Sequence, residues 1–319
     1  MRRALLVGID HYTWAPLQGC INDVHNIAPI LEEHYDKTTN FHCKKLVSSK
    51  KKRVTKHKLM EHIKDLFSRE ADMALFYFSG HGMYNELGGL LVTQDAVQHN
   101  EGVTVSDIIT LANKATNIRQ ILIILDCCHG GNAGAAPILN DNIAMLRKGV
   151  SILTASLHDQ YAVEKRATKE GLFTSILVEG LKGGAADILG DITPASLYNY
   201  AEKILGPWDQ RPVFKTHTSA MATIRNNKPK IDITTLKEII NYFPKSNYQY
   251  HLDPSYDPEL EPKDQKNEHI MGHFRQFLAE GLLKPVGEKH LYHAAKYSES
   301  CQLTPLGIFY WQIINKNKT

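Results

Sequence analysis

The chain has 319 residues, enough for one large domain and a smaller one, each with a core of its own. Apolar residues make up 43% and charged residues 22%, which is typical of an ordinary soluble globular protein. The formal net charge of +3 is small for this length, so it gives no indication of a nucleic-acid or membrane partner.

The five cysteines are odd in number and widely scattered, at Cys20, Cys43, Cys127, Cys128 and Cys301. Neither disulfide spacing nor zinc-ligand spacing is present, so we expect a reducing cytoplasm. The first apolar run, Ala4–Ile9, is too short for a secretory segment, and no later run approaches membrane-spanning length. We therefore expect no membrane association.

Four short segments are almost entirely apolar: Ala4–Ile9, Ala74–Phe78, Ile121–Leu125 and Val150–Leu153. Strands that are apolar on both faces belong to a parallel sheet with helices on each side. Helical patterns between them, at 22–33, 55–68, 104–114 and 171–182, supply the crossovers. The sequence predicts an α/β fold, a three-layer sandwich with a mostly parallel sheet.

One segment, Lys44–Lys58, carries eight basic residues and no acidic one. Such a run is usually a solvated loop and helix start, and a patch that docks a partner is the alternative.

The composition changes around Asn226–Lys230, so we expect a linker at 227–232 between domains at 1–226 and 233–319. Helical patterns at 267–282 and 303–315 predict a small helical second domain, for which a winged helix is one possible form. From residue 231 onward there are 10 Lys and Arg against 11 Asp and Glu. A winged helix that binds DNA needs a basic face, so this balance argues against nucleic acid and favours a protein partner.

Two of the apolar strands end in short reactive clusters, Ser79–Gly82 and Asp126–Gly131. The carboxyl ends of adjacent parallel strands form sites, so we expect His81 and Cys128 to face each other. A nearby imidazole promotes the thiolate that attacks a carbonyl. The flanking glycines would let the backbone approach the scissile peptide closely. We predict His81 as general base and Cys128 as nucleophile, with the amides of Gly82 and Cys128 forming an oxyanion hole.

Each cluster has a simpler explanation when it is taken alone. A Gly-His-Gly segment is weak evidence, and a Cys after a strand is usually a small buried hydrophobe. The run Cys127-Cys128-His129 could suggest a metal site, but three consecutive residues cannot easily all face one ion. The common position at strand ends favours catalysis, and we expect His129 to be structural.

These residues resemble the caspase-like cysteine peptidases. Phe78–Gly82 looks like the His motif of that family, and Asp126–Gly131 looks like the Asp-x-Cys-His-Ser-Gly motif of metacaspases and bacterial orthocaspases, with Gly130 in place of Ser. Leu17–Asp23 is similar to the metacaspase Leu-x-Gly-Cys-x-Asn-Asp segment. The resemblance covers about 1–226. It implies a caspase-type fold and cysteine endopeptidase activity, and it favours a bacterial, cytoplasmic enzyme.

The resemblance also implies which residues surround the S1 pocket: Cys20, Asp23, Ser79 and Asp126. Two carboxylates in a narrow pocket stabilise a cationic P1 side chain and reject an acidic one. We therefore expect protein or peptide substrates cleaved after Arg or Lys. Asp23 taken alone could instead be a helix N-terminal residue that interacts with the helix dipole.

Many metacaspases need calcium, bound by a cluster that includes a paired Asp-Asp between the two motifs. This chain has only Asp95 and Asp107 there, which are not adjacent. An oxygen-rich site with enough ligands is therefore doubtful, and we predict no calcium, no other metal and no cofactor.

Two exposed basic pairs fit the predicted P1 preference and are candidate self-processing sites: Arg147-Lys148 and Lys165-Arg166. Most exposed basic pairs are not cleaved, so processing stays open at both.

The preferred function is a cysteine endopeptidase regulated by a protein partner at the C-terminal domain. Other classes remain: a catalytically silent caspase-like scaffold or adaptor, a transcription regulator, or a separase-like or legumain-like peptidase of different P1 preference. The transcription regulator fits the balanced charge of the C-terminal domain poorly. A silent scaffold would be marked by the loss of a catalytic or pocket residue, and this sequence has lost none of them.

Overall fold

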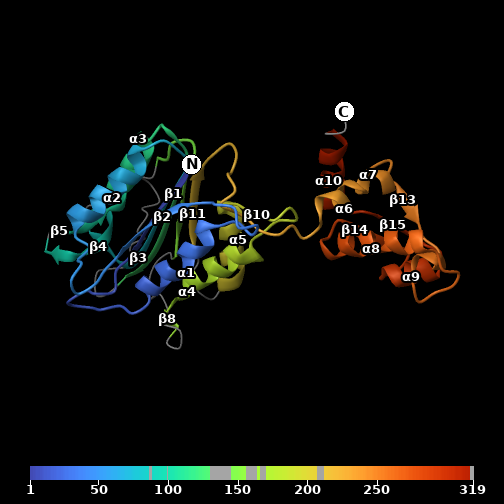
Figure 1. Cartoon of the computed structure of the whole chain (residues 1–319), viewed down its shortest axis with the longest axis horizontal. Helices are drawn as coiled ribbons and strands as arrows, with labels where there is room; N and C mark the ends of the chain where they lie inside the picture. The colour runs from blue at the N-terminus through green and yellow to red at the C-terminus, as the bar shows by residue number, and fades with distance from the viewer. Residues whose placement is uncertain are drawn as a thin grey trace. The chain divides into compact units, whose positions relative to one another are not determined.

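The computed structural model describes residues 1–85, 88–98, 100–129, 145–155, 164–165, 170–206 and 212–316, and it does not extend to the side chains of residues 85, 128, 129, 164, 165 and 170. The chain folds as two compact units, Met1–Lys228 and Pro229–Thr319 (Figure 1). Among the helices of these residues, none is long and apolar enough to cross a membrane.

A central sheet organises the first unit, and six of its strands follow the order β11-β7-β6-β3-β1-β2. All of these run parallel to their neighbours except β11, which is antiparallel to β7. β4 and β5 extend the sheet as antiparallel strands beyond the end of β3. The bounds are Arg2–Gly8 (β1), His42–Val47 (β2), Ala71–Asn85 (β3), Gly88–Val97 (β4), Asn100–Thr104 (β5), Ile118–His129 (β6), Val150–Thr154 (β7) and Val213–His217 (β11).

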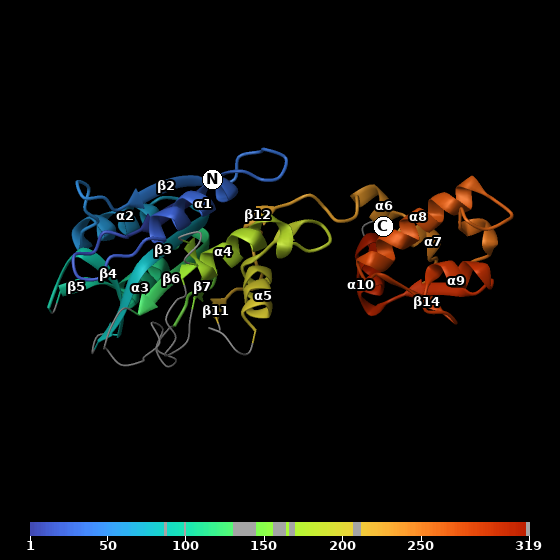
Figure 2. The ribbon, with the colours of Figure 1, turned by 90° about the horizontal axis from the view of Figure 1, so that it is seen from below.

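Helices cover both faces of this sheet, as the two views show (Figures 1 and 2). Successive residues of a strand point to opposite faces, so Leu5 and Val7 pack with α2 and α3 while Ala4 and Leu6 pack with α1, α4 and α5. Strands apolar on both sides are what a double helical cover requires. The bounds are Cys20–Glu32 (α1), Lys56–Ser68 (α2), Val105–Lys114 (α3), Leu172–Glu179 (α4) and Pro194–Leu205 (α5).

The helix predicted over 171–182 is shorter in the structure. α4 ends at Glu179, and a π-helical turn, Gly180–Gly184, follows it. Gly183 has a φ of 136°, which an L side chain rarely adopts, so the regular helix cannot continue through it. Short paired strands complete the unit, at Glu164–Lys165 (β8), Glu170–Gly171 (β9), Asp191–Ile192 (β10) and Arg225–Asn226 (β12).

The second unit combines helices with a small antiparallel sheet in the order β13-β15-β14. Its core contains Phe243, Phe274 and Phe277, each fully buried. The sheet is additional to the helices that the sequence predicts there. The bounds are Ile233–Lys237 (α6), Ile239–Tyr242 (α7), Gln249–His251 (β13), Gln265–Ala279 (α8), Leu283–Val286 (β14), Leu291–Lys296 (α9), Ser300–Leu303 (β15) and Pro305–Lys316 (α10).

The mostly parallel sheet between two helical layers, with a helix-rich C-terminal unit, confirms the predicted fold class.

Candidate active site

The site lies at the carboxyl ends of β3 and β6, which pair in parallel register. His81 is the Cα partner of Cys128, and two residues earlier Ser79 is the partner of Asp126. Paired positions in a parallel ladder share a face of the sheet, and so do positions two residues apart. The register therefore places Ser79 and His81 of β3 next to Asp126 and Cys128 of β6, in one patch.

The imidazole of His81 is held by a backbone carbonyl. His81 is only 3% exposed, and its Nε2 lies 2.7 Å from the carbonyl oxygen of Ala15. A carbonyl can only accept a hydrogen bond, so Nε2 carries the proton in this contact. The neutral ring then has its lone pair on Nδ1, the nitrogen that a base would use.

Two aromatic side chains from the β1–α1 segment pack against this imidazole. The Trp14 ring stacks on it at 4.8 Å between centroids with 25° between planes, and the Tyr12 ring lies at 4.5 Å. The Tyr12 hydroxyl accepts from the His81 backbone N–H at 3.1 Å and donates to the Val92 carbonyl at 3.0 Å. The histidine is therefore fixed through its ring and its backbone.

Gly80 makes this packing possible. A Cβ at Gly80 would lie 2.7 Å from the Tyr12 hydroxyl and 2.9 Å from the Phe78 ring, closer than side chains tolerate. From the sequence we expect the glycines around His81 to let the backbone approach the scissile peptide closely. At Gly80 the close approach is instead that of Tyr12.

A buried carboxylate lies beside this patch, at the start of α1. Asp23 is 1% exposed; its Oδ2 accepts from the Ser79 hydroxyl at 2.9 Å and its Oδ1 from the Gly171 N–H at 3.0 Å. A residue serving only the helix dipole would need neither contact. Asp23 is thus built into the junction of α1, β3 and β9.

The second carboxylate, Asp126, is held from α4. Its Oδ2 accepts from the Thr174 hydroxyl at 2.5 Å, and the Tyr77 hydroxyl lies 2.5 Å from the same Thr174 oxygen. Because the Thr174 hydroxyl donates its one proton to Asp126, the Tyr77 hydroxyl is the donor to Thr174. This buried relay fixes Asp126 at the end of its apolar strand.

Burial raises the pKa of both carboxyls well above the usual range, and the charge of Asp126 raises the pKa of Asp23 further. The hydrogen bonds from Ser79 and Gly171 oppose this shift without cancelling it. Because both pKa values are raised, the pair retains a proton at pH values where an exposed Asp is already ionised. A cation placed beside them would favour the charged carboxylates and so promote loss of that proton.

Comparison with known proteins identifies the family of the chain and its fold. The family model of the caspase domain matches residues 1–222. The chain belongs to the caspase domain family. Among solved structures it is similar to caspase-1 from Spodoptera frugiperda, with a TM-score of 0.50, 11% identity, and coverage of 71% of this chain and 90% of that chain. That identity shows the fold alone, and no curated protein sequence matches the chain.

Membership of the caspase domain family confirms the predicted kinship with caspase-like peptidases, and the likeness to the insect caspase confirms the caspase-like sandwich. The metacaspase branch of the family stays a prediction.

Other predicted residues lie in different surroundings. Cys20 is the first residue of α1 and is buried, and its backbone N–H donates to Asp10 Oδ1 at 2.9 Å. Gly82 pairs with His129 on β6 and with Leu91 on β4. The amide of Cys128 lies on β6, and its side chain is outside the described residues.

The candidate processing pairs differ from each other. Arg147 is half-buried and donates to four carbonyl oxygens, those of Ala112, Ala115, Ile118 and Lys148. Lys148 is exposed. Lys165 belongs to β8, with its side chain outside the described residues, and Arg166 lies outside them entirely.

The two aspartates between the motifs lie in different surroundings. Asp95 Oδ1 accepts from the Lys56 N–H and the Thr93 hydroxyl, and Asp107 lies in the first turn of α3. Within the ranges that the structure describes, no group of three or more His, Cys, Asp or Glu side chains could hold a metal ion.

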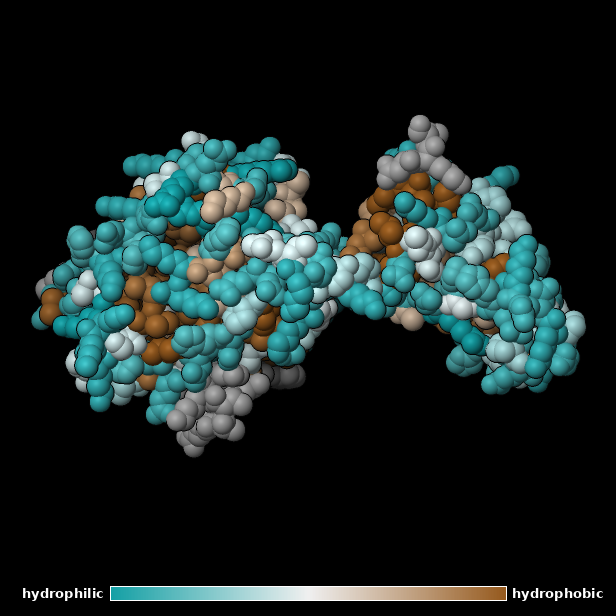
Figure 3. All heavy atoms as spheres, viewed as in Figure 1, coloured by the Kyte–Doolittle hydropathy of each residue, from teal (hydrophilic) through white to brown (hydrophobic). Residues whose placement is uncertain are grey.

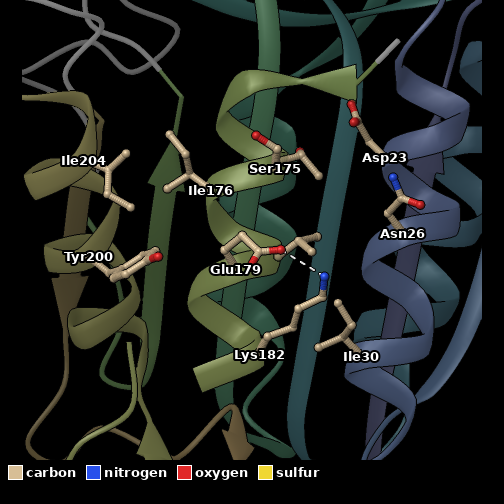
Figure 4. A pocket seen from close by; sticks show the side chains of 11 residues that line it. Asp23, Asn26, Ile30, Ser175, Ile176, Glu179, Lys182, Tyr200 and Ile204 are labelled. Carbon is tan, nitrogen blue, oxygen red and sulfur yellow. Dashed lines mark hydrogen bonds and ion pairs between the residues drawn. The ribbon is translucent and has the colours of Figure 1, made fainter. Parts of the chain in front are cut away.

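A groove of about 580 Å³ opens from Asp23 along α4. Figure 4 shows Asp23 at its head and Asn26 and Ile30 of α1 facing Lys182, which pairs with Glu179 at 2.9 Å. Asp23 and Thr174 line this groove and also belong to the buried hydrogen-bond network of the two carboxyl groups, so the groove adjoins that network.

The sequence did not reveal the residues that hold His81, Asp23 and Asp126 in place: Tyr12, Trp14, Ala15, Gly171 and Thr174. The segment His11-Tyr12-Thr13-Trp14 offered a signal, because two aromatic residues in a polar loop usually pack on something. A backbone carbonyl such as that of Ala15 leaves no mark in the sequence.

Proposed function

We propose that this protein is a cysteine endopeptidase that cleaves proteins after Arg or Lys, with His81 as general base and Cys128 as nucleophile. One observation carries the proposal: the register of β3 and β6 pairs His81 with Cys128 two residues beyond the Ser79–Asp126 pair. The same strand ends thus bear both the reacting groups and the acidic pocket.

In this mechanism the anchored Nε2–H leaves Nδ1 of His81 to take the thiol proton. The thiolate of Cys128 attacks the scissile carbonyl, and the amides of Gly82 and Cys128 donate to the oxyanion. The protonated His81 returns its proton to the leaving amine, and the acyl group remains on sulfur. A water molecule, deprotonated by His81, then hydrolyses the thioester and restores the thiol.

Specificity comes from Asp23 and Asp126, with Ser79 and Cys20 completing the S1 pocket. An entering guanidinium or ammonium group displaces the retained proton and pairs with two buried carboxylates. An acidic P1 side chain would add a third carboxyl to the pair, which repulsion and burial both oppose.

Self-processing, where it occurs, would use Lys148 or the Lys165-Arg166 pair more readily than Arg147. Cleavage after Arg147 would first have to break the hydrogen bonds from its guanidinium to Ala112, Ala115 and Ile118. We propose that activity needs no calcium, since Asp95 is engaged by Lys56 and Thr93.

We propose that residues 227–232 link the peptidase to a regulatory domain at 233–319, which receives an activating protein. α10 supports this role because Leu306, Phe309 and Ile313 expose 44%, 54% and 41% of their surface on one helical face. Figure 3 shows apolar side chains gathered over this helix. The one charged residue in the described part of α10 is Lys316, so this helix offers little positive charge to the phosphates of a nucleic acid.

The test is cleavage of fluorogenic peptides with P1 Arg, Lys or Asp, by wild type and by Cys128→Ala, with calcium or with chelator. We expect turnover after Arg and Lys alone, lost in Cys128→Ala and unchanged by chelator. Turnover after Asp alone would overturn the acidic pocket and leave the dyad standing. Silence of wild type in every condition, including after proteolytic nicking, would favour a caspase-like scaffold.

A further inference from the structure

A compact turn at residues 49–53 presents four consecutive basic side chains, Lys50, Lys51, Lys52 and Arg53, all exposed. The turn is closed by two hydrogen bonds. The Ser49 N–H donates to the Lys52 carbonyl at 3.0 Å, and the Lys52 N–H donates to the Ser49 hydroxyl at 2.8 Å. The charges are therefore displayed from a defined backbone.

This basic turn lies at the same edge of the sheet as the catalytic residues. It follows the carboxyl end of β2, which runs parallel to β1, and β1 runs parallel to β3, the strand of His81. The sheet order β6-β3-β1-β2 puts it on the histidine side of the dyad.

Both ends of the basic turn are fastened to the segment that holds His81. The Ser48 hydroxyl accepts from the Asp10 N–H at 3.0 Å, and Gln94 bridges the other end. Gln94 Oε1 accepts from the Val54 N–H at 2.6 Å, and its Nε2 donates to the His11 carbonyl at 2.8 Å. Tyr12, Trp14 and Ala15 follow directly in the chain.

The charges of the basic turn are not neutralised by described residues. Lys44 and Lys45, on the edge strand β2, pair with Asp65 and Glu32. Across the ranges of the chain that the structure covers, no ion pair joins Lys50, Lys51, Lys52 or Arg53 to an acid, and Arg53 donates to the Gln94 carbonyl. The lysines of β2 already protect the open edge of the sheet, so the turn is not needed for that purpose.

We propose that the basic turn binds acidic side chains of the protein substrate on the leaving-group side of the scissile bond. This inference rests on the proposed peptidase function. His81 must give its proton to the leaving amine, so the chain beyond the scissile bond passes the histidine side, where the turn lies. A substrate would then carry a base at P1 and acids downstream.

Exposed charge pairs are individually weak, so the effect is moderate. Two or three such contacts predict a KM about threefold to tenfold lower for a peptide with downstream acids than for its neutral counterpart. The advantage should shrink as salt rises from low to high ionic strength, because the charges face water.

The experiment uses the full chain and internally quenched peptides that share one P1 Arg. One peptide carries three Glu residues downstream, one carries them upstream, and one carries Gln at all of these positions. Wild type is compared with Lys50→Glu/Lys51→Glu and with a matched control, Lys114→Glu/Arg119→Glu. The control residues are exposed at the opposite end of the sheet, near the start of β6.

We expect the downstream-acid peptide to be preferred by wild type and by the control but not by the turn variant, with the Gln peptide cleaved equally by all three. If the turn variant prefers the downstream-acid peptide as strongly as wild type does, or if wild type prefers the upstream-acid peptide, the proposal is overturned.

A binding measurement separates this proposal from the peptidase function. Fluorescence anisotropy of the downstream-acid peptide on Cys128→Ala should report weaker binding when the turn charges are reversed, even if no peptide is cleaved by wild type. Binding unaffected by turn reversal would overturn the proposal, and so would a preference of the turn for a single-stranded oligonucleotide over the acidic peptide.

Discussion

Asp23 and Asp126 approach a common point above Gly171. A Cβ at Gly171 would lie 3.0 Å from Asp23 Oδ2 and 2.9 Å from Asp126 Oδ2. The backbone of Gly171 has a φ of −65° and a ψ of 131°, so the conformation itself admits any residue. The glycine is required there by space, and the space it leaves adjoins both carboxylates.

Gly171→Ala should therefore close the acidic pocket with a single methyl group. We expect kcat/KM for a P1 Arg peptide to fall about tenfold or more, because the methyl must displace a carboxylate or the entering side chain. Steady-state kinetics measures this. Gly272→Ala, in α8 with no atom within 4 Å of the added methyl, is the matched control and should keep full activity. Equal activity of the two variants would contradict the assignment of the pocket.

Asp126→Asn should separate specificity from stability. Both buried acids have raised pKa values, so the native protein holds a proton that the unfolded chain has lost. Stability then falls as pH rises from about 4, where an unfolded Asp titrates, through the raised native pKa values. Asn carries no charge and can still accept from Thr174. We expect the variant to gain roughly 1–3 kcal/mol at alkaline pH and little at pH 4.

Urea unfolding at pH 5 and pH 8 measures this difference, and peptide assays should show that cleavage after Arg is lost. A variant that is destabilised at both pH values would show that Asp126 is ionised and paired in the native state.

The sequence could predict the parts of this site that sit on regular elements. Wholly apolar strands and the polar clusters at their ends predict a parallel sheet and a site at its edge, and His81 and Cys128 follow from that. What holds them could not be predicted. The anchor of the imidazole is the backbone oxygen of Ala15, which any residue could supply.

Thr174 shows the same limit. It lies 48 residues from Asp126 along the chain, and only the packing of α4 on the sheet brings its hydroxyl to that carboxylate. The antiparallel strand β5 and the small sheet of the second unit were also missed, because these strands are short and contain polar residues that interrupt the alternation of apolar and polar positions.

Trp14 is expected to position His81 through ring stacking. Its side chain is 50% exposed, yet its ring covers the imidazole at 4.8 Å. Removing the ring in Trp14→Ala should lower kcat about twofold to tenfold with KM nearly unchanged, since the stack orients the base and does not bind P1. The pH–rate profile should also shift, because water gains access to the imidazole. Trp14→Phe keeps a stacking ring and should restore most of kcat; failure of that rescue would indicate a different role.

The two units should unfold independently. The buried clusters around the large sheet contain residues of Met1–Lys228 alone, and the second unit has its own core around Phe243, Phe274 and Phe277. A unit with a complete core does not need its neighbour to fold. Calorimetry of the full chain should resolve two transitions, and a chain ending at Lys228 should retain one of them at the same temperature within a few degrees. A single shared transition would show that the cores are coupled.

The same truncated chain tests regulation. If the second unit receives an activating protein through α10, the truncated peptidase should lose its response to that protein, and Phe309→Ser in the full chain should reproduce the loss. Phe309 is 54% exposed, so the serine removes apolar surface from α10 without opening a core. Gln312→Ser, an exposed polar position on the same helix, is the control and should respond as wild type does. Unchanged activity and unchanged regulation after truncation would exclude a regulatory role for residues 229–319.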